Sequence, residues 1–255
     1  VTGTDPLAEY IPTAHVGVEI GGGVGLHYHY GTLGQLQHGE NYATAYLRAA
    51  GGQINKPRSL KKWPYKKGNK VKLFILAGHR NMEGERAFIQ ELKELKGSIG
   101  LLKDNPEIAF KYSLGGAYHV SNEWEPMGLT GYYDTFGPEL SFSNVLADKL
   151  GEEFAVAKFT HSGSQIIDWT PEGSMAKSRH IYPKLVGFIR EAIMELEARG
   201  NKVELGGIFY HLGENDMSFH PYRRQAAERL KTIIAKSRED LGQPDLKWYV
   251  SQQPP

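Results

Sequence analysis

Apolar runs of strand length alternate with helical periods through most of this chain. The strand-like runs cover residues 71–77, 154–159, 205–210 and 246–251. The helical periods cover residues 85–96, 138–150, 181–199 and 222–241, and Gly200 follows the third of them as a C-terminal stop. Largely apolar strands that alternate with helices indicate a parallel sheet covered on both faces. We therefore expect an α/β protein with a right-handed, doubly wound sheet.

The segment 51–70, "GGQINKPRSLKKWPYKKGNK", interrupts this alternation. It contains two prolines, three glycines and seven Lys or Arg residues, and no acidic residue. This composition is typical of a solvated connector between structured parts. A basic ligand-binding patch is the alternative interpretation.

The segment before this connector looks displaced. The sequence "GLHYHYGTLGQLQHGENYATAYLRA" contains a His-rich loop followed by a helix with Leu36, Ala43 and Leu47 on one face. The last segment of the chain, "LKWYVSQQPP", is a strand followed by a loop. In many α/β folds a loop and helix of this kind would directly follow such a strand.

Composition narrows the classes of partner. With 255 residues, 40% of them hydrophobic, the chain is long enough for one large domain, which we expect to span residues 1–255. A formal charge of +1 favours neither nucleic acid nor an anionic membrane. The absence of cysteine excludes thiol catalysis and thiolate metal sites, and it leaves the compartment open. Because no apolar run approaches the ~18 residues of a spanning helix and the start "VTGTDPLAEY" lacks a basic and apolar leader, we expect a soluble chain.

Four motifs, in a fixed order, give the chain a family resemblance. They are "AGHRNMEG" after a strand, "FGPELSFSNVLADKL" at a helix start, and "FTHSGSQIIDW" and "FYHLGENDM", each at the end of a further strand. In turn they resemble the "GQSNM" turn, the "GPE" helix start, the glycine pair with a downstream Trp, and the "QGESD" or "GEND" motif of the SGNH hydrolases. Within that superfamily the chain is most similar to carbohydrate O-acetylesterases related to sialate O-acetylesterase and acetylxylan esterase. The resemblance covers residues 71–251 and implies a three-layer α/β/α, flavodoxin-like fold with about five strands in a mostly parallel sheet.

The closing motif of the family, Asp-x-x-His followed by a helix, is missing after Ser251. The segment "HYHYGTLGQLQHGENYATAYL", near the start of the chain, is similar to it. We infer a circular permutation, in which residues 1–50 resemble the family's C-terminal part, residues 51–70 bridge its usual termini and residues 71–255 resemble its N-terminal and central parts. A coincidental similarity between two helices is the alternative.

The resemblance assigns catalytic positions, but the residues there are unusual. The family uses a Ser nucleophile, a His base and an Asp that orients the His. The nucleophile position falls on Arg80, whose guanidinium has donors and no usable lone pair. The base position falls on His29, with His27 as second choice. The family Asp lies three residues before its His, and here Leu26 precedes His29 and Val24 precedes His27, neither of which can orient an imidazole. Two of the three catalytic roles are therefore predicted to be absent.

The oxyanion side of the site, by contrast, is predicted to be retained. Gly163 and Ser162 occupy the position of the glycine pair, and Asn215 occupies that of the family's oxyanion Asn. The resemblance further implies a set of substrate-binding residues: His79, Asn81, Gln165, Trp169, Glu214 and Asp216. For Trp169 the alternatives are stacking on a sugar and packing in the core.

Alternatives stay open for the polar residues of the motif loops. Arg80 either forms an ion pair with Glu214 or Asp216, or points into the former ester pocket and binds a carboxylate, sulfate or phosphate group. Ser162 and Ser164 are candidate replacement nucleophiles beside a histidine, although small polar residues also suit a tight loop.

Five histidines, His27, His29, His79, His161 and His211, lie in or beside the motif loops. No pair has the i, i+4 spacing on a predicted helix that favours zinc, so we expect no metal and no other cofactor.

Two hypotheses for function follow. In the first, the chain is a carbohydrate O-acetylesterase-like SGNH protein that acts, or whose ancestors acted, on acetylated glycans by serine-esterase chemistry. In the second, it is a non-catalytic pseudoenzyme that uses the former ester pocket to bind an acidic or acetylated glycan or another small anion. Both hypotheses predict a small-molecule or glycan ligand and no nucleic-acid or membrane partner. The family resemblance favours an extracellular or periplasmic location.

Overall fold

The computed structural model describes residues 18–21, 27–30 and 58–251, apart from residues 86, 132, 133, 177 and 178. Its contacts divide the chain into two units, residues 1–56 and 57–255, and each is described by itself. In the first unit, strand β1 (Val18–Gly21) pairs antiparallel with β2 (His27–Tyr30). The prediction of a loop at His27 and His29 was therefore wrong, because "HYHY" pairs as a strand. The helix predicted after it lies outside the described residues.

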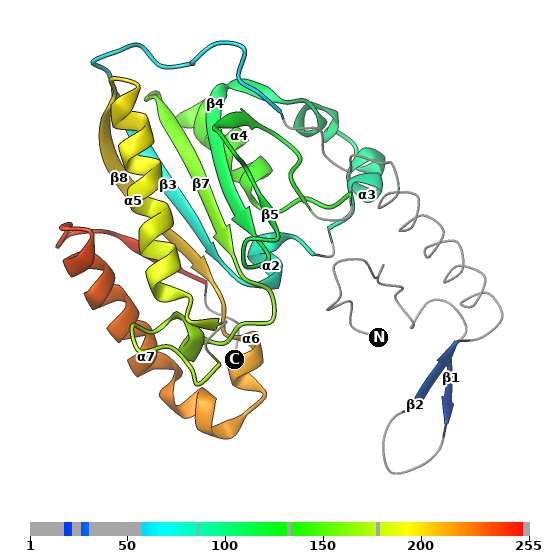
Figure 1. The fold of residues 1–255 in the computed structure, drawn as a ribbon. Helices are drawn as coiled ribbons and strands as arrows, with labels where there is room; N and C mark the ends of the chain where they lie inside the picture. The colour runs from blue at the N-terminus through cyan, green and yellow to red at the C-terminus, as the bar shows by residue number, and fades with distance from the viewer. Residues whose placement is uncertain are drawn as a thin grey trace. The chain divides into compact units, whose positions relative to one another are not determined.

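The second unit is built on a sheet with the strand order β5-β4-β7-β3-β8-β9, with β6 also paired to β4 (Figure 1). The five strands that run parallel are β4 (Asn105–Leu114), β7 (Phe154–Thr160), β3 (Lys70–Gly78), β8 (Lys202–His211) and β9 (Trp248–Val250). The short strands β5 (His119–Val120) and β6 (Glu125–Met127) are antiparallel to β4. The predicted parallel sheet of about five strands is confirmed.

Helices connect these strands on both faces of the sheet. The longer ones are α3 (Ile89–Glu94), α4 (Glu139–Lys149), α5 (Tyr182–Ala198) and α7 (His220–Asp240), and each lies within or close to a predicted helical period. The short ones are α2 (Arg80–Glu83), η2 (Ile99–Leu102), η3 (Ile166–Trp169) and α6 (Glu214–Met217). α2, η3 and α6 carry three of the four motifs.

Alternation along β3 divides the apolar side chains between two cores. Leu73 and Ile75 are fully buried in a cluster that includes Leu185 and Ile189 of α5. Phe74 and Leu76 belong to a second cluster, which includes Leu140 of α4. Successive side chains of a strand point to opposite faces, so each face has its own helical cover. The result is a three-layer α/β/α arrangement, with α5 on one face of the sheet and α4 on the other (Figure 1).

The described end of the basic connector is anchored in the core. The Tyr65 hydroxyl accepts a hydrogen bond from the Ala109 N–H (2.9 Å) and donates one to the Phe154 carbonyl. Trp63 packs edge-on against Tyr65 and lies beneath the Arg199 guanidinium, 4.3 Å from the ring centroid. Trp63 and Tyr65 therefore anchor the segment to the packed domain, whereas its residues 61, 62 and 66–70 are exposed.

A fully buried ion pair connects the layers near the first motif. The Nζ atom of Lys158 in β7 lies 2.6 Å from Oε2 of Glu139, the first residue of α4, and both side chains are inaccessible to solvent. Nζ also donates to the Glu83 carbonyl (3.0 Å), and Glu139 accepts the Gly137 N–H (3.0 Å). These bonds satisfy both charges, as burial requires. The "GPE" motif thus fixes α4 and the end of α2 to the central sheet.

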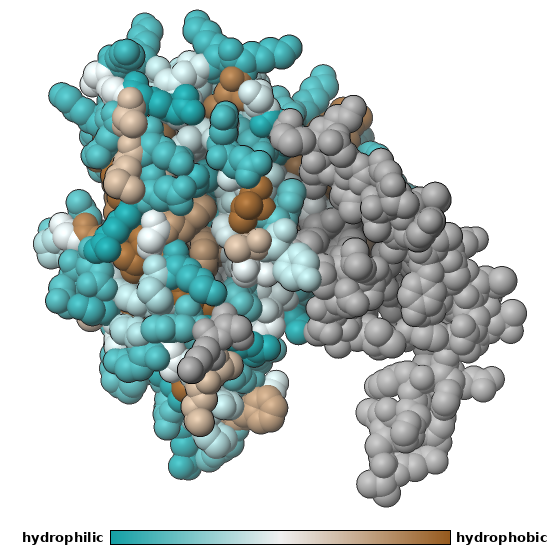
Figure 2. Space-filling model, viewed as in Figure 1, coloured by the Kyte–Doolittle hydropathy of each residue, from teal (hydrophilic) through white to brown (hydrophobic). Residues whose placement is uncertain are grey.

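The face of the second unit seen in Figure 2 is mainly hydrophilic, and its apolar residues form small separate groups. No helix in the described part of the chain is long and apolar enough to cross a membrane.

Replacement of Lys158 by Met should destabilise the protein strongly, because it leaves the Glu139 carboxylate buried without a counter-charge. We expect a loss of about 3–5 kcal/mol in the free energy of unfolding, measured with denaturant. The control is Lys231→Met, which removes an ion pair whose side chains are 72% and 74% exposed, and should cost less than about 1 kcal/mol. The double variant Lys158→Met/Glu139→Leu should regain part of the loss. Equal effects of the two single variants would contradict the assigned role of the buried pair.

Candidate functional site

The site lies at the carboxyl edge of the sheet, where β3 turns into α2. Gly78 ends β3 with φ +151°, and a Cβ there would come within 2.1 Å of the His211 carbonyl oxygen on the neighbouring strand. Only glycine allows this approach. The backbone is extended at His79 and becomes helical at Arg80, so the first motif forms the strand-turn-helix on which a nucleophile is presented in related folds.

The short helix α2 is held from inside the protein. Its buried Glu83 accepts hydrogen bonds from the Thr160 hydroxyl (2.7 Å) and the Gly115 N–H (3.1 Å). Burial raises the pKa of Glu83, and the hydrogen bond from Thr160 partly offsets that effect. These contacts fix the position of the turn relative to β7 and the end of β4.

His79 is buried and takes part in the site as a neutral imidazole. Its Nε2 lies 3.0 Å from the Asn215 Nδ2, so we assign Nε2 as acceptor and Nδ1 as the protonated nitrogen. Nδ1 lies 3.9 Å from the Glu214 Oε2, too far for a hydrogen bond. Burial lowers the pKa of His79 to about 4, with Glu214 opposing this shift and Arg80 adding to it. The ring is therefore uncharged near neutral pH.

Asn215, the predicted oxyanion donor, is already engaged within the protein. Its Nδ2 contacts both the His79 Nε2 (3.0 Å) and the Ser164 carbonyl (3.3 Å). An amide nitrogen has two hydrogens, so these two contacts use its donor capacity. In this arrangement Asn215 can stabilise an oxyanion only if His79 moves.

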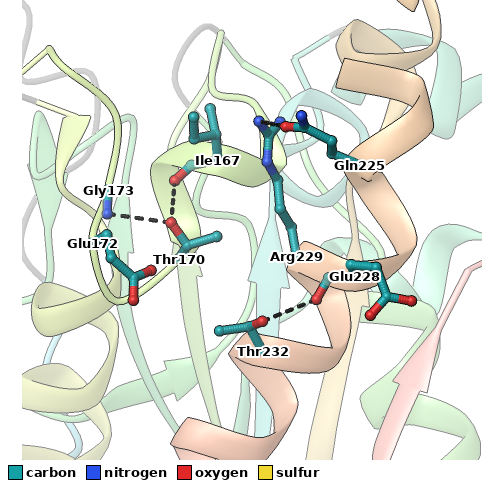
Figure 3. A pocket seen from close by; sticks show the side chains of 8 residues that line it. All are labelled: Ile167, Thr170, Glu172, Gly173, Gln225, Glu228, Arg229 and Thr232. Carbon is teal, nitrogen blue, oxygen red and sulfur yellow. Dashed lines mark hydrogen bonds between the residues drawn. The ribbon is translucent and has the colours of Figure 1, made fainter. Parts of the chain in front are cut away.

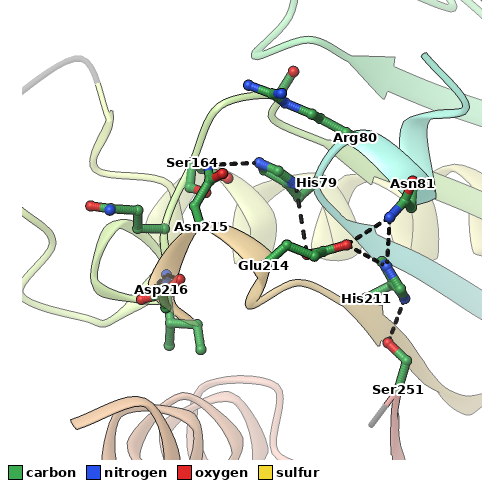
Figure 4. A network of polar contacts seen from close by, with 12 residues as sticks. His79, Arg80, Asn81, Ser164, His211, Glu214, Asn215, Asp216 and Ser251 are labelled. Atoms are coloured by element: carbon green, nitrogen blue, oxygen red, sulfur yellow. Dashed lines mark hydrogen bonds and ion pairs between the residues drawn. The ribbon is translucent and has the colours of Figure 1, made fainter. Parts of the chain in front are cut away.

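Arg80 lies at the predicted nucleophile position but does not form either predicted ion pair. Its Nε lies 3.7 Å from the Glu85 Oε2, and the Arg80 side chain is 38% exposed. Figure 4 shows its guanidinium pointing away from Glu214. The expected pairing with Glu214 or Asp216 was wrong, because both carboxylates accept hydrogen bonds from other groups.

Glu214 belongs to a chain of polar contacts (Figure 4). Its Oε1 lies 2.7 Å from the Nε2 of His211 and 2.7 Å from the Nδ2 of Asn81. The other ring nitrogen of His211, Nδ1, lies 2.6 Å from the Ser251 hydroxyl. Burial alone would raise the pKa of Glu214, but hydrogen bonds from its own N–H, His211 and Asn81 outweigh burial and lower it. The carboxylate is therefore ionised at neutral pH.

The other acidic residue of the motif, Asp216, is fully buried. It accepts the Ile166 N–H through both oxygens, at 3.2 and 3.0 Å. Trp169 is also fully buried, donates from Nε1 to the Ser164 hydroxyl (2.9 Å) and packs edge-on against Phe159. The prediction that Asp216 and Trp169 contact substrate was wrong, because neither side chain reaches the surface.

The predicted glycine-pair loop is shaped by contacts of its own. Gly163 adopts φ +73°, and its carbonyl accepts a hydrogen bond from Arg179 (3.2 Å). The Ser162 hydroxyl donates to the Glu85 carboxylate. Gln165 is the N-cap of η3, and its N–H donates to the Asp168 carboxylate (2.8 Å). Gln165 is therefore fixed as a helix cap at the edge of the site.

The candidate replacement nucleophiles in this loop lack an imidazole partner. Ser162 is paired with a carboxylate, and Ser164 is fully buried and donates to the His161 carbonyl (2.6 Å). The His161 ring contacts the Ser162 carbonyl through Nδ1 (3.1 Å). Neither hydroxyl is therefore placed for proton transfer to His161.

His27 and His29 belong to the first unit, so their distance from Arg80 is not described, and the circular permutation stays a prediction. Sequence reasoning missed the pairing of His211 with Ser251. The signal was present, because His211 directly follows the predicted strand 205–210 and Ser251 ends the predicted strand 246–251, and parallel neighbours bring such positions together. Within the described ranges no group of three or more His, Asp or Glu side chains could hold a metal ion.

A separate hollow of about 360 Å³ lies between η3 and α7 (Figure 3). Its polar lining includes Thr170, Glu228 and Arg229, and Arg229 is bonded to Gln225. None of the predicted site residues lines it, so we place the candidate site at the motif edge instead.

The parallel sheet between two helical layers, with its polar motif loops at the carboxyl edge, defines an SGNH-type α/β/α protein. The profile of the family described as carbohydrate esterase, sialic acid-specific acetylesterase, matches residues 70–253, and the chain belongs to this family. A solved structure from Arabidopsis thaliana aligns with a TM-score of 0.53 and 20% identity, over 72% of this chain and 73% of that one. NanS aligns with a TM-score of 0.51 and 15% identity, over 74% of this chain and 69% of that one. These likenesses support the fold. A search of curated proteins found no significant match.

The buried state of His79 predicts a pH dependence. Because its pKa falls from about 6.5 when unfolded to about 4 when folded, the unfolded chain binds more protons between these values, and stability should fall as the pH drops from 6.5 to 4. The His79 ring resonance in NMR spectra should stay constant from pH 8 to about 5.5. In His79→Gln the loss of stability over this window should be smaller. A His79 resonance that titrates near pH 6.5 would contradict the buried neutral assignment.

Proposed function

We propose that this carbohydrate O-acetylesterase-type protein uses its first-motif turn to bind an acidic or acetylated glycan, with Arg80 as the anion contact. The observation that carries this proposal is the partly exposed guanidinium at the nucleophile position. It cannot attack an ester, and its forked donors suit a carboxylate. The family's description as sialic acid-specific supports a carboxylate-bearing sugar as ligand.

The local charge balance supports the same conclusion. The nearest carboxylate, Glu85, is 3.7 Å from Arg80 Nε, and such a partly exposed ion pair is weak. Glu85 also accepts a hydrogen bond from Ser162, so the Arg80 guanidinium is only partly neutralised. Glu214 is held by His211 and Asn81 and does not compete for Arg80. A ligand carboxylate can therefore pair with Arg80 at a small cost.

The neighbouring residues favour binding over acyl transfer at this position. Asn215 donates to the neutral His79, which takes the place of the family Gln in the first motif. An ester bound at position 80 would thus meet no nucleophile there, and the Asn215 amide would not be free to stabilise an oxyanion. The substitutions at residues 79 and 80 together support a site that recognises a glycan and does not form an acyl-enzyme there.

Arg80→Gln should weaken the binding of O-acetylated sialic acid about 10- to 100-fold, since a charge-assisted bond contributes about 1.5–3 kcal/mol. Calorimetric titration at low salt measures this change. Arg224→Gln, on the exposed side of α7, is the matched control and should bind as the parent does. A neutral acetylated xylo-oligosaccharide tests whether the carboxylate is needed. Equal affinities of Arg80→Gln and the parent would refute Arg80 as the anion contact.

Arg80→Ser should restore little esterase activity, because a serine at this position would have no general base placed beside it and the Asn215 amide would still be bound to His79. We expect the hydrolysis of an aryl acetate to stay within about threefold of the parent rate. The double variant His79→Gln/Arg80→Ser releases Asn215 and should exceed the single variant. Robust turnover by Arg80→Ser alone would show that the oxyanion side is already competent.

A further inference from the structure

A second polar constellation lies beside the first motif, at the ends of β8 and β9. Tyr210 and Val250 are register partners in these parallel strands, so the next residues, His211 and Ser251, lie side by side. The Ser251 N–H continues the pairing by donating to the Tyr210 carbonyl (3.1 Å). Main-chain bonds therefore hold an exposed serine next to a histidine.

The His211 ring lies between the Ser251 hydroxyl and the Glu214 carboxylate. The Ser251 hydroxyl is 2.6 Å from Nδ1, and the Glu214 Oε1 is 2.7 Å from Nε2. The Asn81 Nδ2 lies 3.2 Å from Nε2 and 2.7 Å from the same carboxylate oxygen. Because the carboxylate contact is the shorter one at Nε2, we assign the ring proton to Nε2, donated to Glu214. Nδ1 then carries the lone pair and faces the hydroxyl.

We propose that Ser251, His211 and Glu214 form a catalytic triad that attacks small acyl esters, at a site distinct from the Arg80 position. Ser251 is the nucleophile, His211 the general base and Glu214 the group that orients the imidazole. The proposal goes beyond the glycan-binding function, because none of its steps requires Arg80.

Each part of the triad has a structural cause. His211 and Ser251 are placed by the register of β8 and β9. Glu214 is the first residue of α6, three residues after His211, and Gly213 makes the turn between them with φ +137°. Asn81 of α2 donates to the Glu214 carboxylate and limits its rotation. The His211 and Glu214 side chains are 28% and 24% exposed, so the imidazole is shielded while the serine is open to a substrate.

The reaction balances with water as the second substrate. Ser251 Oγ bonds to the acetyl carbonyl carbon as its proton passes to His211 Nδ1; the ester C–O bond then breaks, and the leaving alkoxide takes that proton. Acetyl-Ser251 and the free alcohol result. Water attacks the acetyl carbon while Nδ1 accepts its proton, and cleavage of the Ser251 acyl bond returns the proton to Oγ and releases acetic acid.

Labelling of the serine is a more sensitive readout than turnover. The Asn215 amide is bound to His79 and the Ser164 carbonyl, so it is not free to stabilise the tetrahedral intermediates of acylation and deacylation. Loss of one oxyanion donor typically lowers kcat about 100- to 1,000-fold. Because a covalent label accumulates even when the reaction is slow, a reagent that traps the nucleophile is the direct probe.

The test treats the full chain with diisopropyl fluorophosphate and locates the label by peptide mass spectrometry. We expect one label per chain, on Ser251, and none on this peptide in Ser251→Ala. His211→Gln, which keeps a hydrogen-bonding side chain but removes the base, should slow labelling about 100-fold or more. Ser141→Ala is the matched control, because Ser141 is an exposed serine of α4 bonded only to the Pro138 carbonyl, and should label as the parent does.

Three results would overturn the triad: no labelling of the parent, a label on another serine, or labelling of His211→Gln at the parent rate. Near-UV circular dichroism of each variant establishes that it is folded before its rate is compared. Sialic acid binding, measured separately, reports on Arg80 alone, so failure of the triad and failure of the binding proposal give different results.

Discussion

The buried ion pair between Lys158 and Glu139 is the constraint around which the site is arranged. Neither charge reaches solvent, so each must find its partners within the protein. Those partners are the start of α4, the end of α2 and the middle of the sheet. A change in the path of any of these elements would leave a charge unpaired in the core. The turn at residues 79–80 therefore has little freedom, whatever side chains it presents.

On this fixed turn, the two substituted side chains act together. His79 points inward, stays neutral and occupies the Asn215 amide, whereas Arg80 points outward and keeps much of its charge available. An internal hydrogen bond thus takes up the donor that an ester reaction would use. Alongside it, the His211–Glu214 pair connects α6 to the end of β8, and His211 contacts the hydroxyl of Ser251, which follows β9.

The sequence predicted the parts of the fold that depend on local pattern. Four strands were identified because they are largely apolar, and the parallel sheet followed from their alternation with helices. Strand β4, which contains Lys111, was missed. That lysine is buried, and its charge is met by Glu195 at 2.9 Å, a residue 84 positions away that no local pattern indicates.

Prediction of the site failed where it depended on which way a side chain points. Motif spacing placed Arg80 near Glu214 and Asp216, but Glu85, five residues along, is its partner. The same spacing could not show that Trp169 faces the core. The pairing of β8 with β9 brings His211 to Ser251 through main-chain register, without regard to which way a side chain points.

The Tyr65 phenol has a mechanical consequence. Its hydroxyl lies between the Ala109 N–H and the Phe154 carbonyl, so a side chain from the segment before β3 links β4 to β7. Tension applied at residue 58 would therefore reach the link between β4 and β7 before it reaches the start of β3.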